Sequence, residues 1–172
     1  MNCNNNNCCL IKFFPYIGNK TKFKNKFNNI KAGIFIYDEK QKKVLLVQSR
    51  GRLWGPPKGS KKYCETIKEC AVREVREETG LSIPIDLLTK SILVLKKCTY
   101  FYIEMDVCNV NIQHDVENND VNSVAWIHID CLGNFIRNGQ ISLTQHCRIV
   151  FKEFLNKTFP TSTFIFKRKL SF

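Results

Sequence analysis

The chain has 172 residues, of which 44% are hydrophobic, and its 27 Lys and Arg outnumber its 15 Asp and Glu. This length and composition suit one compact domain with a buried core. No stretch reaches the roughly 20 apolar residues of a membrane span, and Lys12 and Pro15 break the first apolar run, which lacks the layout of a secretion signal. We therefore expect a soluble, intracellular and most simply cytoplasmic protein that is not membrane-bound.

The nine cysteines are odd in number and include no Cys-x-x-Cys pair. We expect free thiols in a reducing compartment. His128 and Cys131 are three residues apart and His146 adjoins Cys147, but no second pair stands at zinc-finger spacing. The sequence therefore does not predict a structural zinc site.

The positive charge is concentrated at the two ends, since no Asp or Glu precedes Asp38 or follows Glu153. Basic ends favour a polyanionic partner, and they make RNA binding plausible. The alternative is a coding bias of an AT-rich genome, because the uncharged Asn is also abundant. We give these two interpretations about equal weight.

In chain order, residues 1–29 are rich in Asn, Lys and Phe and predict a poorly ordered arm or an appended strand. The aromatic rings of this arm alternate with lysines, so they could stack bases and bind phosphates. We favour the alternative that they cover one edge of the core. Three Gly and two Pro between Gly51 and Gly59 predict an irregular loop.

Apolar patterning predicts the regular elements of the rest of the chain. A second helix is expected over Ser142–Leu155. The predicted strands are 31–37, 43–48, 88–96, 99–107 and 121–129.

The clearest predicted helix runs from Thr66 to Gly80. Thr66 and Glu69 have capping-box spacing at its start, and Gly80 is a typical helix terminator. Glu77 and Glu78 follow Glu74 by three and four residues, which places the three carboxylates on one face of the helix. Like charges at this spacing repel one another, and oxygen-ligated Mg²⁺ would compensate for the repulsion. A solvated acidic face is the alternative for three glutamates alone.

The residues around these glutamates extend the motif. The spacing is G-x5-E-x7-R-E-U-x-E-E-x-G-U, where U is a bulky aliphatic residue. Its positions are filled by Gly59, Glu65, Arg73, Glu74, Val75, Glu77, Glu78, Gly80 and Leu81. A chance match is on the order of one in a million or rarer. The chain resembles the Nudix hydrolase family, and flanking elements extend the resemblance over roughly Lys31–Leu155.

The resemblance implies an α/β (α+β) fold, with a mixed sheet sandwiched between helices and a loop–helix–loop catalytic motif. We divide the chain into a basic N-terminal arm at 1–29, a Nudix domain at 30–158 and a basic tail at 159–172. The oligomeric state is not predicted.

The resemblance also assigns roles to residues and implies Mg²⁺ or Mn²⁺ as the cofactor. Glu78 or Glu74 would be the catalytic base, and Arg73 would orient a glutamate. Glu74, Glu77 and Glu78 would bind the metal together with the main-chain carbonyl of Lys58. Gly59, Glu65 and Gly80 would support the site.

A further metal ligand is expected outside the box. In the family an acid often precedes a late Trp by about six residues, and Asp120 stands six before Trp126. The family residue is more often Glu, which has a longer side chain. Glu117 and Glu104 are the alternatives to Asp120.

The segments around Trp54 and Lys58 resemble both mRNA-decapping and diadenosine-polyphosphate Nudix enzymes. Lys58 would contact substrate phosphate, while Trp54 would stack a base or hold the loop. The implied reaction is hydrolysis of a phosphorus-containing acid anhydride, a pyrophosphohydrolase activity. We slightly favour capped mRNA over a small nucleotide or dinucleoside polyphosphate, and both over a non-catalytic binding module.

Overall fold

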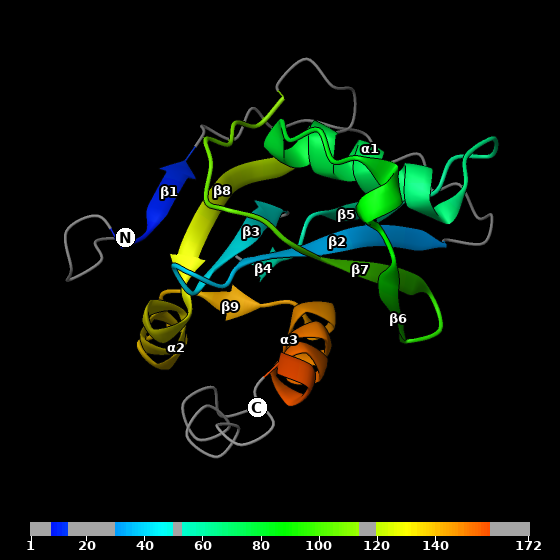
Figure 1. Ribbon diagram of the computed structural model, residues 1–172. Coiled ribbons are helices and arrows are strands. Elements are labelled where there is room, and N and C mark those ends of the chain that lie inside the picture. The colour runs from blue at the N-terminus through cyan, green and yellow to red at the C-terminus, as the bar shows by residue number, and fades with distance from the viewer. Residues whose placement is uncertain (1–7, 14–29, 50–52, 114–119, 159–172) are drawn as a thin grey trace.

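The protein, described here from a computed structural model, is placed at residues 8–13, 30–49, 53–113 and 120–158, with side chains described as far as Phe154. One nine-stranded mixed sheet forms its centre. Helix α1 (Ile67–Thr79) covers one face, and α2 (Ile129–Arg137) and α3 (Gln145–Thr158) cover the other (Figure 1). The predicted sandwich of a mixed sheet between helices is confirmed.

The main path of the sheet has the order β1-β8-β3-β2-β7-β6. These strands are β1 (Leu10–Phe13), β2 (Lys31–Asp38), β3 (Lys43–Ser49), β6 (Lys90–Val94), β7 (Cys98–Glu104) and β8 (Val121–His128). Neighbours on this path are antiparallel except for β2 and β7, which are parallel. A short 3-10 helix (Ile85–Leu87) precedes β6. The five strands predicted from patterning are all present, with ends shifted by a few residues.

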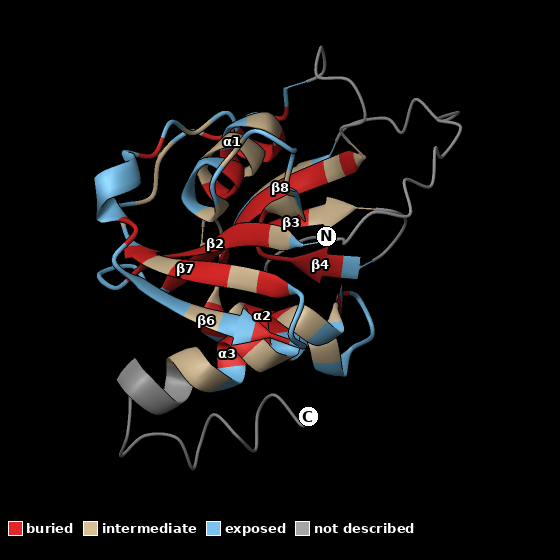
Figure 2. Ribbon diagram, turned by 90° about the vertical axis from the view of Figure 1, so that its right-hand side faces the viewer, coloured by how far each residue is buried: buried red, intermediate tan, exposed pale blue. Residues whose placement is uncertain are grey.

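The central strands are apolar on both faces because helices cover both. Along β2, Phe35 and Tyr37 pack into the cluster that includes α2 and α3 residues. Ile34 and Ile36 pack into the second cluster, with Val75 of α1. Figure 2 shows the resulting buried sheet between helices with exposed outer surfaces. In the described part of the chain, none of the helices has the length and apolar character required to cross a membrane.

The prediction of an irregular loop over Gly51–Gly59 is wrong in part. β4 (Leu53–Gly55) pairs with β3, and β5 (Lys58–Ser60) pairs with β2. Two prolines separate these strands, where the chain needs no N–H for a ladder. The Pro57 carbonyl instead accepts a hydrogen bond from the Ile34 N–H at 3.2 Å. The Gly and Pro content therefore predicted the interruption of regular structure at the two prolines, but it did not predict the two short strands on either side.

Two further elements were not predicted. Helix α2 has only nine residues and contains Gly133, which weakens its sequence pattern. Strand β9 (Ser142–Leu143) pairs with β4 and occupies the expected start of the second helix. Helix α3 therefore begins later, at Gln145, where Thr144 Oγ1 accepts the Cys147 N–H at 3.1 Å.

Strand β1 lies within the predicted N-terminal arm and pairs antiparallel with β8, with Leu10 opposite Trp126. Of the two structures predicted for the arm, the appended strand is therefore the one found at residues 10–13. The rest of the arm's alternating aromatic residues and lysines fall outside the described residues. The domain boundaries at residues 29 and 158 stay predictions.

Asp38 is a buried acid at the end of β2, and it gives a test of the fold. Burial opposes its ionisation, but the Gln41 and Val107 N–H groups donate to its carboxylate at 2.7 Å each and leave its pKa below the ordinary value. We expect Asp38→Asn to lower the free energy of unfolding by about 1–2 kcal/mol at neutral pH.

The pH dependence has a definite sign. Because the folded-state pKa of Asp38 is depressed, its stabilisation is complete above the unfolded-state pKa and is lost as the pH falls through the folded-state pKa. Denaturant unfolding should be measured at pH 6 and at pH 3. Between these two pH values, Asp38→Asn should lose less free energy of unfolding than the parent chain. Equal losses would contradict this role.

Candidate active site

Helix α1 carries most of the candidate site, and local interactions fix both of its ends. The Thr66 hydroxyl accepts the Glu69 N–H at 3.2 Å, and the Glu69 carboxylate accepts the Thr66 N–H at 2.6 Å. Gly80 ends the helix in the left-handed conformation at φ 76°, which glycine adopts without strain. The predicted helix and capping box are confirmed.

Arg73 joins this helix to the loop before it. Its Nε and Nη2 donate to the two oxygens of Glu65 at 2.9 and 2.7 Å, and Nη2 also donates to the Ser60 carbonyl at 3.0 Å. The hydrogen bonds from Arg73 hold the pKa of Glu65 down at about 2. Glu65 thus links Arg73 to the loop, because it also accepts a hydrogen bond from the Lys62 N–H at 2.6 Å.

The same guanidinium also contacts two of the predicted metal ligands. Arg73 Nη1 donates to Glu74 at 2.7 Å and to Glu77 at 2.9 Å. Lys62 lies 3.7 Å from the other Glu77 oxygen. The structure thus places Arg73 against both glutamates; Lys62, whose only sequence signal was its basic position in the box loop, was missed.

Gly59 lets the loop approach this helix closely. A Cβ placed at Gly59 would overlap the Glu74 carboxylate. Desolvation raises the pKa of Glu74, although the charge of Arg73 opposes the shift. The conformation of Glu74 therefore depends on the absence of a side chain at Gly59.

Glu78 is the most enclosed of the box carboxylates, and its residue is only 8% exposed. One oxygen accepts the Lys58 N–H at 2.9 Å. Burial raises the pKa of Glu78 to about 8; the charges of Glu74 and Asp120 add to the increase, and the Lys58 charge opposes it. Asp120, directly before β8, is thus close enough to influence the same site.

The oxygen-rich donor set fits a hard divalent cation such as Mg²⁺ or Mn²⁺. A cation would compensate the desolvated charges of Glu74 and Glu78. In this arrangement, however, Arg73 Nη1 bonds to Glu74 and Glu77, and no set of glutamates among the described residues brings three ligand atoms together. A bound ion would therefore compete with Arg73 Nη1 for Glu74 and Glu77.

The interpretation of Trp54 as a base-stacking residue does not fit its position. Trp54 is fully buried in the core cluster, and its carbonyl accepts the Thr144 N–H at 2.9 Å. A ring with no exposed surface offers no face to a base. The alternative role of holding the loop agrees with these contacts, and Lys58 remains as the candidate phosphate contact.

Of the two alternatives to Asp120, the structure describes Glu104, which it does not bring to the site. Glu104 pairs with Tyr37, whereas Lys58 pairs with Gly33, four residues earlier on β2. Four residues of strand separate these positions by about 13 Å. Glu117 lies outside the described residues.

Comparison with known proteins decides the family, because the model of the NUDIX domain matches residues 28–147, more than half of the chain. The chain belongs to the Nudix family. This Nudix chain is 33% identical over 109 residues to protein 111R of Invertebrate iridescent virus 3, covering 61% of this chain and 62% of that protein.

Two further similarities involve more of this Nudix chain. It is 26% identical over 136 residues to mRNA-decapping enzyme subunit 2 of Arabidopsis thaliana, covering 74% of this chain and 36% of that protein. The matches thus span between about a third and two thirds of these relatives. The NUDIX domain of Shewanella oneidensis NrtR, solved with ADP ribose, shares the fold at TM-score 0.56 and 20% identity, covering 83% and 97% of the two chains.

The contact between Gly59 and Glu74 gives a direct test of the site. We expect Gly59→Ala to displace the Glu74 carboxylate and to lower Mg²⁺-dependent turnover by about 10²-fold, because small displacements of catalytic groups have effects of this size. Turnover and the unfolding midpoint would be measured side by side.

Gly139→Ala is the matched control. Unlike Gly59, Gly139 has a positive φ of 68°, and a Cβ there meets no atom within 4 Å. This variant should lose stability through backbone strain while its turnover stays close to that of the parent chain. Equal turnover in Gly59→Ala and Gly139→Ala would show that the close approach of Gly59 to Glu74 is unimportant.

Proposed function

We propose that the chain hydrolyses a phosphoanhydride bond in a nucleoside-diphosphate-linked substrate by attack of water, with capped RNA as the favoured substrate. The observation that carries this proposal is the enclosed Glu78 carboxylate beside Glu74, Asp120 and the Lys58 backbone. Such a strongly perturbed carboxyl in a charged cluster is typical of catalytic sites. The Nudix family membership supports a hydrolase that acts on pyrophosphate bonds.

In this proposal Mg²⁺ or Mn²⁺, when bound, neutralises pyrophosphate charge and lowers the pKa of a coordinated water. Glu74, Glu77 and Glu78 would supply carboxylate oxygens to this ion, and Asp120 would add a further carboxylate. Glu78 in its ionised form accepts the proton of the attacking water, with Glu74 as the alternative base. Arg73 is a positioning residue, because its hydrogen bonds hold three carboxylates and the loop.

Capped RNA is favoured by two observations. The similarity to a plant mRNA-decapping subunit covers 74% of this chain, and the formal net charge of +12 suits a polyanion. The loop before α1 adds Lys61 and Lys62 beside Tyr63, which is 98% exposed. An exposed ring among cations can stack on a base of a single strand.

A small nucleotide or dinucleoside polyphosphate is the second candidate substrate. It is supported by the box itself, which specifies the phosphoanhydride but not the group attached to it. The matched region is also only 36% of the decapping relative, so that protein's activity as a whole does not transfer. A binding module without activity is the least supported function, because every acid of the box is retained.

The substrate is tested by incubating the chain with Mg²⁺ or Mn²⁺ and a panel containing capped RNA, uncapped RNA and dinucleoside polyphosphates. We expect release of a methylated guanosine diphosphate from capped RNA. The affinity for RNA should fall steeply with salt, because each phosphate contact to a single strand contributes a slope of about −0.7 in log K against log salt.

The opposite pattern identifies the second candidate. Rapid cleavage of dinucleoside polyphosphates, with RNA binding that is weak and independent of salt, would exclude the RNA proposal but retain the hydrolase. Tight nucleotide binding without any cleavage would leave only the binding module.

A further inference from the structure

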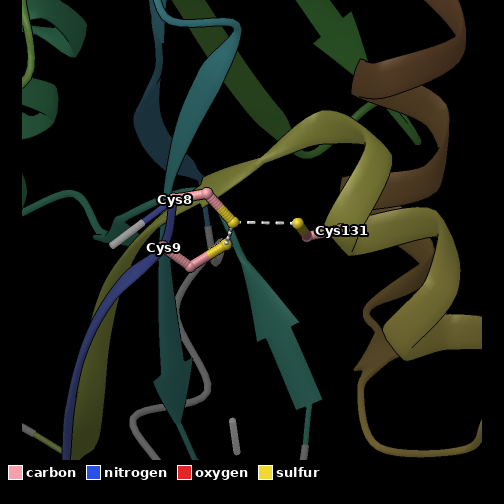
Figure 3. Close-up of side chains that lie close together, drawn as sticks. All are labelled: Cys8, Cys9 and Cys131. Atoms are coloured by element: carbon pink, nitrogen blue, oxygen red, sulfur yellow. Dashed lines mark hydrogen bonds between the residues drawn. The ribbon is translucent and has the colours of Figure 1, made fainter. Parts of the chain in front are cut away.

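Three cysteine sulfurs meet on the opposite side of the sheet from the carboxylates of α1. Cys8 Sγ lies 3.1 Å from Cys131 Sγ and 3.6 Å from Cys9 Sγ (Figure 3). All three sulfurs lie within 4.8 Å of one another, and all three residues are partly buried. We call Cys8, Cys9 and Cys131 the thiol cluster.

The fold brings this cluster together from residues that are 123 positions apart. β1 begins at Leu10, directly after Cys9, and pairs with β8. β8 ends at His128 and passes directly into α2, which places Cys131 in the first turn of that helix. The His128 N–H donates to Cys9 Sγ at 3.4 Å, so secondary structure positions at least two of the sulfurs.

We propose that the thiol cluster is a binding site for Zn²⁺ or another thiophilic divalent ion in the reduced chain. Cys8 is disulfide-bonded in this structure, which differs from our expectation of free thiols. The site therefore requires reduction: a thiol or phosphine reductant gives two electrons to the S–S bond, and each sulfur takes a proton. Metal binding then displaces the protons of the coordinating thiols.

In the reduced chain the three sulfurs would fill three of the four positions of a tetrahedral zinc site. Zn–S bonds of about 2.3 Å in a tetrahedron place the sulfurs about 3.8 Å apart, and the spacings of the thiol cluster lie around this value. Sulfur ligands select soft ions over Mg²⁺. The His128 N–H would stabilise the Cys9 thiolate from outside the coordination shell.

An ion at this position would connect β1 to α2, and hydrogen bonds connect β1 to the end of α1. Lys12 Nζ donates to Asn109 Oδ1 and Asn111 Oδ1 at 2.7 Å and to the Val110 carbonyl at 2.8 Å. The Asn111 N–H in turn donates to the Thr79 carbonyl at 2.9 Å. Metal occupancy would thus stabilise a path from the N-terminal strand to α1.

The test uses the full chain, reduced with a phosphine and titrated with Cd²⁺ or Co²⁺, whose bonds to thiolate absorb in the ultraviolet. Absorbance reports thiolate ligation and is insensitive to ions bound by the glutamates. The variants are Cys9→Ser and Cys131→Ser, with Cys64→Ser as the matched control because Cys64 is an exposed free thiol. Circular dichroism checks that each variant is folded.

We expect the parent chain and Cys64→Ser to saturate at one ion per chain, and Cys9→Ser and Cys131→Ser to lose the saturable absorbance. Zn²⁺ should also raise the unfolding midpoint of the reduced parent chain but not that of Cys131→Ser. A reduced parent chain without saturable thiolate absorbance would overturn the proposal. Titrations of Cys9→Ser and Cys131→Ser that match the parent chain would also overturn it. If one variant folds poorly, the effect of Zn²⁺ on the unfolding midpoint of the parent chain still tests the proposal.

Discussion

The guanidinium of Arg73 organises the candidate site. Its planar set of N–H donors reaches the loop through Ser60 and Glu65 and reaches the neighbouring turn of the helix through Glu74 and Glu77. A guanidinium stays ionised and can donate in several directions at once. Without it, partly buried carboxylates would repel one another without compensation. Arg73 therefore joins the box loop to α1, together with the hydrogen bond from the Lys58 N–H to Glu78.

The arrangement leaves one carboxylate without this compensation. Glu78 accepts a hydrogen bond from the backbone N–H of Lys58, and burial raises its pKa to about 8. A divalent ion would favour its ionised form and would draw Glu74 and Glu77 from Arg73. In the function that we propose, Arg73 therefore holds the charged side chains in place, and Glu78 would bind the cation and accept the proton.

Much of the fold was predictable because its signals are local. The ends of α1 are set by Thr66, Glu69 and Gly80, and the apolar runs of the central strands reflect burial on both faces. The shared face of Glu74, Glu77 and Glu78 likewise follows from their spacing along α1. The short strands β4, β5 and β9 were missed because their hydrogen bonds are made with distant segments, and Trp54 could not be distinguished from a surface ring by its neighbours in sequence. The thiol cluster was missed for the same reason, since Cys131 meets Cys8 only after β1 pairs with β8.

The most direct measurement of the central claim is the turnover of Glu78→Gln with Mg²⁺, compared with the parent chain on the substrate that the parent chain cleaves. The amide keeps the shape of the buried side chain but cannot accept the proton of an attacking water. The account predicts a loss of turnover of about three orders of magnitude or more, in line with removal of a general base, while the unfolding midpoint is retained. Turnover within tenfold of the parent chain would contradict it.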